Sequence, residues 1–262
     1  MKLFFRQFGS GKPVVILHGL FGLSDNWVTF GKRLGEDYSI YIPDLRNHGQ
    51  SPHSGVFDFP SLESDVAELI DDLGLGRIIL IGHSLGGKIA MFFALHHPEM
   101  VEKLVVVDIS PRPSPPDREH QQLLNAMLGV DFSLAGSRSD VENQLKATVS
   151  SPKLRQFLLK NVYWRDRHSM DWRLNLRGIN ENLLAVGEGI SEPGTFDGPA
   201  LFIRGGKSDY IADSDLPGIQ MKFPRAGVTT IANASHGARA VDGARSVHAR
   251  GEFNELREIP PV

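Results

Sequence analysis

The sequence predicts an α/β protein in which helices flank a mostly parallel central sheet and one helical insertion interrupts the sheet. Continuous apolar runs alternate with helical spacing over the first half of the chain, which is typical of strands that helices bury on both faces. A proline-rich break at 110–116 then opens a long stretch without a strand run, and the strand pattern resumes near residue 200. The β-α-β-α-β order implies right-handed crossovers and a ligand site at the carboxyl ends of the strands.

Several apolar runs predict the strands of this sheet. In chain order they are Val14–Leu17, Ser39–Pro43, Ile78–Ile81, Leu104–Val107, Ala200–Ile203 and Val228–Ile231. Between the second and third runs, apolar residues at 62, 66, 69, 70 and 73 have helical spacing, and Ser61 suits a capped helix start. A second helical pattern, Lys88–Leu95, follows the third run.

The segment 111–194 is expected to form a wholly helical lid, inserted into a core made of residues 1–110 and 195–262. Core and lid together would form a single catalytic unit. Helical patterns occur in it at 119–128, 141–149, 153–162 and 174–186. Large apolar residues of these helices are expected to form a wall over the active site: Leu123, Leu124, Met127, Phe157 and Leu158.

Composition excludes several classes of protein. The 262 residues carry a formal net charge of −3, so no basic surface favours nucleic acid. The absence of cysteine excludes disulfides, thiolate chemistry and zinc–thiolate sites. No apolar run approaches the roughly 18 residues of a membrane span, and the N-terminal residues lack the pattern of a signal peptide. We therefore expect a cytoplasmic protein with no membrane span, no nucleic-acid partner and no bound metal, and the sequence does not indicate its oligomeric state.

The segment Gly82–Gly86 has the pattern G-x-S-x-G of a nucleophile elbow. The apolar run Ile78–Ile81 leads directly into it and the helical pattern Lys88–Leu95 leads out, and this strand–turn–helix context gives the motif its chemical meaning. A sharp turn would expose the Ser84 hydroxyl at the edge of the sheet. Ser84 is therefore the candidate nucleophile.

A serine hydroxyl needs a base within hydrogen-bond reach, and in this type of elbow protein the base follows the acid along the chain. His236 comes just after the last predicted strand and is the candidate base. His248 competes with it, but no strand pattern precedes that histidine.

The acid of the triad has two candidates. Asp108 ends the apolar strand that follows the elbow helix, where a lone buried carboxylate would be costly without a partner. Asp209 lies three residues after Gly206, at the end of the next strand, and that spacing is also typical of the acid. We favour Asp108 and keep Asp209 as the alternative.

The loops at the same edge supply the other candidate site residues. The backbone N–H groups of Leu20 and Leu85 are expected to bind the oxyanion of the tetrahedral intermediate. His18 and His48 are expected to shape their loops rather than to act as acid or base. Arg46 could bind an anionic group of the substrate or form a structural ion pair with a nearby carboxylate.

Three segments resemble a known family: Leu17–Gly22, Asp44–Gly49 and Gly82–Lys88. They look like the α/β-hydrolase fold and, more narrowly, like the small YbfF-type bacterial esterases and their mitochondrial abhydrolase relatives. Lys88 and the D-L-R-N-H-G loop are the more discriminating marks, and the resemblance covers residues 1–236. It implies a triad acid at Asp108 and hydrolysis of short-chain esters or acyl thioesters through an acyl-enzyme, without a cofactor.

Other functions remain open on the same scaffold, because a fold does not determine its chemistry. Relatives with this triad include lyases, perhydrolases and C–C hydrolases, and a non-catalytic ligand-binding homologue is a further alternative. The glycine- and alanine-rich tail 237–245 departs from the amphipathic helix that usually follows the base in such relatives. The sequence does not indicate acyl-chain length or a choice between ester and thioester.

Overall fold

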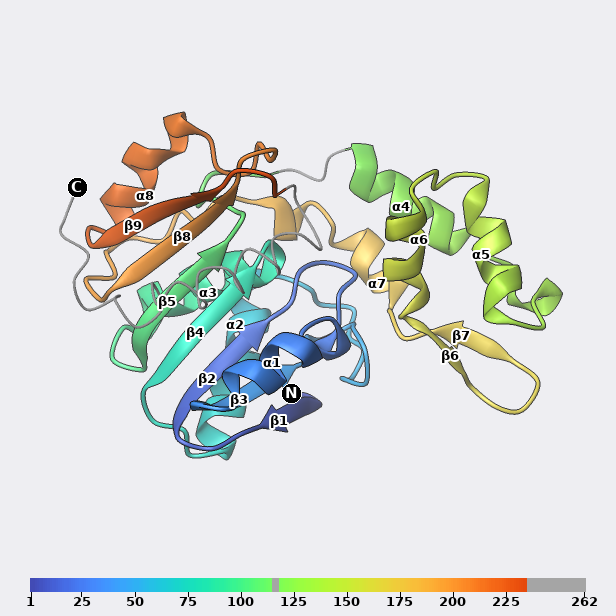
Figure 1. The fold of residues 1–262 in the computed structure, drawn as a ribbon, viewed down its shortest axis with the longest axis horizontal. Coiled ribbons are helices and arrows are strands. Elements are labelled where there is room, and N and C mark those ends of the chain that lie inside the picture. Colours follow the sequence, from blue (N-terminus) through green and yellow to red (C-terminus); the bar gives the residue numbers. More distant parts are fainter. Residues whose placement is uncertain (115–117, 235–262) are drawn as a thin grey trace.

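A seven-stranded sheet organises the computed structural model, which describes residues 1–114 and 118–234 (Figure 1). The strand order is β1-β3-β2-β4-β5-β8-β9, and every neighbouring pair is parallel except β1 with β3. The strands are β1 (Phe5–Phe8), β2 (Lys12–Leu17), β3 (Tyr38–Pro43), β4 (Ile78–His83), β5 (Val101–Val107), β8 (Ala200–Gly205) and β9 (Ala226–Ile231). The mostly parallel sheet that the sequence predicts is confirmed.

Helices cover both faces of the sheet, which explains the continuous apolar runs. Alternate residues of one strand enter different cores: Val14 and Ile16 pack with α1, whereas Val15 and Leu17 join the larger core with α2 and α3. The core helices are α1 (Val28–Leu34), α2 (Phe59–Asp72), α3 (Leu85–His96) and α8 (Leu216–Lys222), with short 3-10 turns η1 (Ser24–Asn26) and η4 (Asp213–Asp215). Among the described residues, no helix is both long and apolar enough to cross a bilayer.

Two local predictions need correction. The helix expected from residue 61 begins at Phe59, and its N-cap is Asp58, whose carboxylate accepts the Ser61 N–H at 2.9 Å. The first strand, β1, was not expected at all. Its four residues, Phe5 to Phe8, lie along an antiparallel edge, where three are partly buried and Gln7 is exposed, and they form no continuous apolar run.

The chain between β5 and β8, which contains the expected insertion 111–194, projects from the carboxyl end of β5 before it returns to the sheet (Figure 1). Its helices are α4 (Arg118–Leu128), α5 (Arg138–Lys146), α6 (Pro152–Leu159) and α7 (Leu176–Glu181), with 3-10 turns η2 (Phe132–Leu134) and η3 (Ala185–Gly187).

The insertion is not wholly helical, because β6 (Val162–Trp164) and β7 (Met170–Trp172) form an antiparallel hairpin. That expectation was wrong because each strand has only three residues, too few to show a strand pattern. The buried Val162, Met170 and Trp172 hold the hairpin against the apolar core that the insertion shares with the sheet.

Candidate active site

Ser84 stands at the sharp turn between β4 and α3. Its backbone has φ 52° and ψ −118°, a left-handed conformation that strains any residue with a side chain. The Ser84 N–H donates to the Val107 carbonyl of β5 at 3.0 Å, and the Ser84 carbonyl accepts the Lys88 N–H at 3.0 Å as α3 begins. Strand and helix together therefore hold the strained turn in place.

The two glycines of the motif are required by close backbone approach. A Cβ on Gly82 would lie 2.1 Å from the Gly86 carbonyl oxygen, and one on Gly86 would lie 2.4 Å from the Leu17 carbonyl oxygen. Real Cβ atoms essentially never come so close to another heavy atom. The elbow can form here only because neither position carries a side chain.

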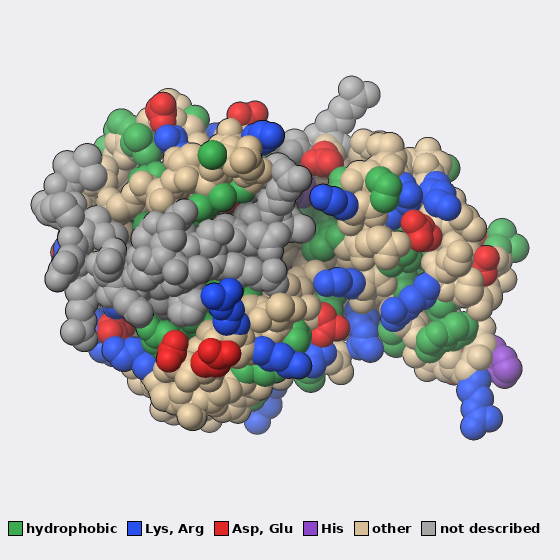
Figure 2. Space-filling model, viewed as in Figure 1, with side chains coloured by type: hydrophobic (Ala, Val, Ile, Leu, Met, Phe, Trp, Pro, Cys, Tyr) green, Lys and Arg blue, Asp and Glu red, His purple; other side chains and the backbone are tan. Residues whose placement is uncertain are grey.

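A cleft of about 40 Å³, partly open to solvent, lies beside Ser84. It brings together Ser84, Leu20 and Leu85, the candidate nucleophile and the two candidate oxyanion residues. Its other lining residues are Lys88, Ile109, Ser114, His120, Leu183, Val186, Gly187 and Tyr210. Hydrophobic side chains are visible in the hollow where the insertion meets the core (Figure 2).

The expected wall of Leu123, Leu124, Met127, Phe157 and Leu158 does not line this cleft. Three of these residues, Leu124, Met127 and Leu158, are almost fully buried in the apolar core that the insertion shares with the sheet. Their apolar faces hold the helices together, so the cleft instead receives His120 at the start of α4 and the segment 183–187 near the return to the core.

Asp108 lies at the end of β5, next to the elbow. Its backbone φ is 55° and its side chain is 1% exposed. Oδ1 accepts the Gly205 N–H at 2.9 Å, and Oδ2 accepts the Ser208 hydroxyl at 2.7 Å. A strained, buried and oriented carboxylate is typical of a functional site.

Asp209 is placed differently. The residue is exposed, and its backbone carbonyl accepts a hydrogen bond from the Arg112 guanidinium at 2.7 Å. Both histidines considered as the base, His236 and His248, lie outside the described residues.

Comparisons with known proteins identify the family of this chain. The family model described as alpha/beta hydrolase fold matches residues 12–238. The chain belongs to the α/β-hydrolase family. Ser84, the strained turn and the cleft at the strand ends are thus parts of an α/β-hydrolase scaffold.

Several similar proteins are named as esterases or lipases. The chain is 39% identical to the sn-1-specific diacylglycerol lipase ABHD11 of Danio rerio, over 87% of this chain and 74% of that protein. It is 31% identical to Esterase YbfF of Escherichia coli, over 88% of each chain. A solved marine microorganism esterase superposes with a TM-score of 0.92 and 38% identity, over 96% of this chain and 99% of the other. The α/β-hydrolase is a carboxylic ester hydrolase of the esterase/lipase type.

Two buried histidines of the hydrolase hold the loops around the cleft. His18 Nε2 accepts the Leu45 N–H at 3.0 Å, and His48 Nε2 accepts the Phe21 N–H at 3.2 Å, so both rings link the loops after β2 and β3. Burial lowers the pKa of His18 to about 4, and burial together with the nearby His18 ring lowers the pKa of His48 to about 3. Both imidazoles are therefore neutral acceptors at pH 7, as their expected loop-shaping role requires.

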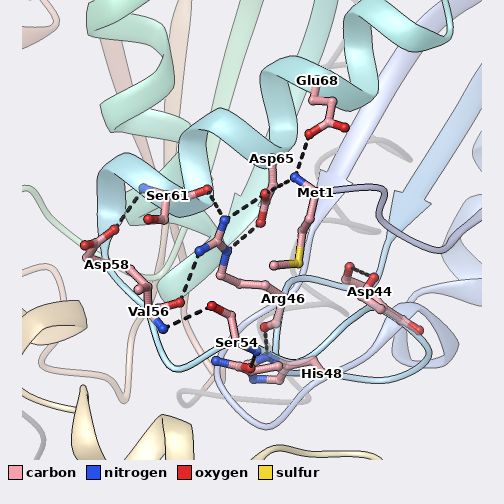
Figure 3. Close-up of polar contacts among 12 residues, drawn as sticks. Met1, Asp44, Arg46, His48, Ser54, Val56, Asp58, Ser61, Asp65 and Glu68 are labelled. Atoms are coloured by element: carbon pink, nitrogen blue, oxygen red, sulfur yellow. Dashed lines mark hydrogen bonds and ion pairs between the residues drawn. The ribbon is translucent and has the colours of Figure 1, made fainter.

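Arg46 forms the structural ion pair that the sequence analysis left open (Figure 3). Its Nε donates to Asp65 Oδ2 at 2.6 Å, and one terminal nitrogen donates to Asp65 Oδ1 at 2.8 Å. The remaining donors reach the backbone carbonyls of Val56 at 3.1 Å and Ser61 at 2.9 Å. The guanidinium thus faces α2, and Arg46 is not among the residues that line the cleft.

Within residues 1–114 and 118–234, no group of three His, Cys, Asp or Glu residues is placed to hold a metal ion.

Proposed function

We propose that this hydrolase is a serine esterase that cleaves short-chain carboxylic esters or acyl thioesters through an acyl-enzyme. Ser84 would be the nucleophile, His236 the base, and Asp108 the acid that orients it. The observation that carries the proposal is the strained Ser84 backbone, which puts this serine in the lining of a cleft at the point where β4 ends and α3 begins.

In the first half of the reaction, Ser84 Oγ attacks the acyl carbonyl carbon while His236 takes the hydroxyl proton. The Leu20 and Leu85 N–H groups would bind the oxyanion. The tetrahedral intermediate then collapses, the bond to the alcohol or thiol breaks, and His236 returns the proton to that leaving group. Water repeats the sequence on the acyl-enzyme and releases the carboxylic acid and free Ser84.

Asp108 suits the role of the triad acid better than Asp209 does. A buried imidazolium needs a carboxylate fixed beside it. The Asp108 carboxylate is buried and oriented by two donors, whereas Asp209 is exposed. We further propose that the insertion is a lid, because His120, Leu183 and Val186 form one wall of the cleft.

The test is turnover on a series of p-nitrophenyl esters and acyl thioesters, with a long-chain diacylglycerol as the contrasting substrate. Ser84→Ala should lose about a thousandfold or more in kcat and should no longer be labelled by an organophosphate. Asp108→Asn should lose more than about a hundredfold, and the matched Asp209→Asn less than about tenfold.

An active Ser84→Ala variant, or a label on another serine, would end the serine-esterase proposal. A larger loss for Asp209→Asn than for Asp108→Asn would move the acid. Efficient turnover of the diacylglycerol over the short esters would overturn the short-chain assignment.

A further inference from the structure

Lys88 is an unusual group in this site, since it is a cation buried in the first turn of α3. Its residue is 1% exposed, and it lines the same cleft as Ser84. A buried ammonium is costly unless its donors are matched. All its hydrogen-bond partners in the described structure are backbone carbonyls: Lys88 Nζ donates to those of Pro111 at 3.4 Å, Arg112, and Glu188 at 3.0 Å.

These carbonyls belong to the two places where the chain passes between core and insertion. Pro111 and Arg112 lie where the chain leaves the core after β5, and Glu188 lies where it returns. The two crossings are also bonded to each other. Ser114 N–H donates to the Gly187 carbonyl at 2.8 Å, and Ile190 N–H donates to the Pro111 carbonyl at 2.8 Å. One ammonium therefore joins the elbow helix to both crossings at once.

The crossings also form part of the wall of the cleft. Ser114 lines it from the outgoing crossing, and Val186 and Gly187 line it next to Glu188. A shift of either crossing relative to α3 would change the space beside Ser84. The contacts of Lys88 thus hold the two crossings at a fixed distance from α3, and this distance determines how much space the cleft leaves for an acyl group beside Ser84.

We propose that Lys88 is a positioning residue that fixes both crossings of the insertion against the elbow helix and thereby sets the acyl-chain length that the cleft accepts. This inference rests on the proposed function, in which the acyl group is bound beside Ser84 under the insertion.

The protonated form of Lys88 suits this arrangement better than the neutral amine. An ammonium has three N–H donors, which equals the number of carbonyls around it, whereas a neutral amine has two. Burial lowers the pKa of Lys88 to about 7, Arg112 acts in the same direction, and Asp215 opposes them. His120 and Tyr210 are the other titratable side chains lining the cleft.

The decisive variant is Lys88→Met, which keeps an unbranched side chain and removes every donor. It should raise KM for p-nitrophenyl acetate about tenfold while kcat changes less than about threefold. The ratio of kcat/KM for the decanoate to that for the acetate should rise about tenfold, because a loosened wall admits the longer chain. Backbone amides of 118–187 should exchange hydrogen faster, with no change in β4 and β5.

Two further variants supply a second substitution at Lys88 and a control. Lys88→Gln retains two donors on a shorter chain and should shift the chain-length ratio by an intermediate factor, which provides a second reading if Lys88→Met does not fold. Lys12→Met is the matched control, because Lys12 bonds to Glu102 on the exposed surface of the sheet, and it should leave KM and the ratio unchanged.

A Lys88→Met protein that melts earlier but keeps the acetate KM, the chain-length ratio and the exchange pattern would overturn the proposal and leave Lys88 a purely stabilising residue. This failure is distinct from failure of the proposed function, which an active Ser84→Ala variant would reveal in an enzyme with normal Lys88.

Discussion

Replacing Arg46 by Met tests which of its two possible roles this residue performs. The change keeps the aliphatic stem and removes every guanidinium donor. Asp65, whose residue is 1% exposed, would lose hydrogen bonds of 2.6 and 2.8 Å, and the carbonyls of Val56 and Ser61 would lose theirs. The result is a buried carboxylate with fewer partners, while the cleft beside Ser84 keeps all its lining residues.

The expected cost follows from this geometry. Breaking a buried ion pair by removing one partner costs about 3–5 kcal/mol. The Met1 amino group still donates to Asp65 Oδ1 at 2.6 Å, which places the cost at the lower end (Figure 3). A loss of about 3 kcal/mol corresponds to a fall in Tm of about 6–12 °C for a domain of this size.

Urea unfolding followed by tryptophan fluorescence measures the loss, and KM for a neutral and an anionic ester measures substrate binding. We expect lower stability with both KM values unchanged. Adding Asp65→Leu to Arg46→Met should recover part of the stability, since no charge is then left buried. The control is Arg177→Met, which removes an exposed pair with Glu181 and should cost less than about 0.5 kcal/mol. Normal stability with a tenfold higher KM for the anionic ester alone would refute this reasoning and assign Arg46 to substrate binding.

Two further predictions concern the loops and the elbow. His18 and His48 have folded pKa values of about 4 and about 3, below the ordinary 6.5, so the unfolded chain takes up protons that the folded chain does not bind. The free energy of unfolding should therefore fall as the pH drops below 6.5, and urea titrations at pH 7 and 5 should show a smaller fall for His18→Gln; an equal fall would contradict the prediction. Gly82→Ala should abolish activity and lower Tm by about 6–12 °C, because its Cβ would lie 2.1 Å from the Gly86 oxygen and overpacking of this severity costs about 3 kcal/mol. Gly74→Ala is the control, with a φ of 59° but nothing near its Cβ, and should cost only about 1 kcal/mol; equal melting of the two variants would count against the steric argument.

The sequence predicted the sheet well where strands are buried on both faces. There the apolar run is continuous and the signal is local, as in Val14–Leu17 and Ile78–Ile81. The prediction failed at β1, a half-buried antiparallel edge, and at the β6–β7 hairpin, whose three-residue strands are stabilised by tertiary contacts. One such contact is the Trp172 indole N–H, which donates to the Met127 carbonyl at 3.0 Å.

The candidate site could be predicted in part for a similar reason. Ser84, Asp108 and Leu20 each follow a strand, and strand ends of a parallel sheet meet at one edge. The contacts of Lys88 could not be predicted, because its carbonyl partners lie 23, 24 and 100 residues away along the chain. In the sequence, Lys88 was notable only because it follows the G-x-S-x-G motif and is one of the marks of the family resemblance. The wall of the cleft was mispredicted because an apolar pattern identifies a buried helix face and does not indicate what that face packs against.

The crossing at Pro111 and Arg112 connects the elbow to the candidate acid. Lys88 on the elbow helix bonds to the carbonyls of these two residues. The Arg112 guanidinium continues the connection, because it pairs with Asp215 at 2.9 Å and donates to the Asp209 carbonyl at 2.7 Å.

Asp209 follows Ser208, whose hydroxyl donates to Asp108 Oδ2. The Asp209 backbone carbonyl, which accepts from Arg112, thus helps to hold the loop that orients the Asp108 carboxylate. An asparagine at position 209 would keep that carbonyl. This is the structural reason to expect Asp209→Asn to retain activity while Asp108→Asn loses it. If Asp108 is the acid, as proposed, the spacing after Gly206 that made Asp209 a candidate matches a residue that supports the proposed acid through its main chain.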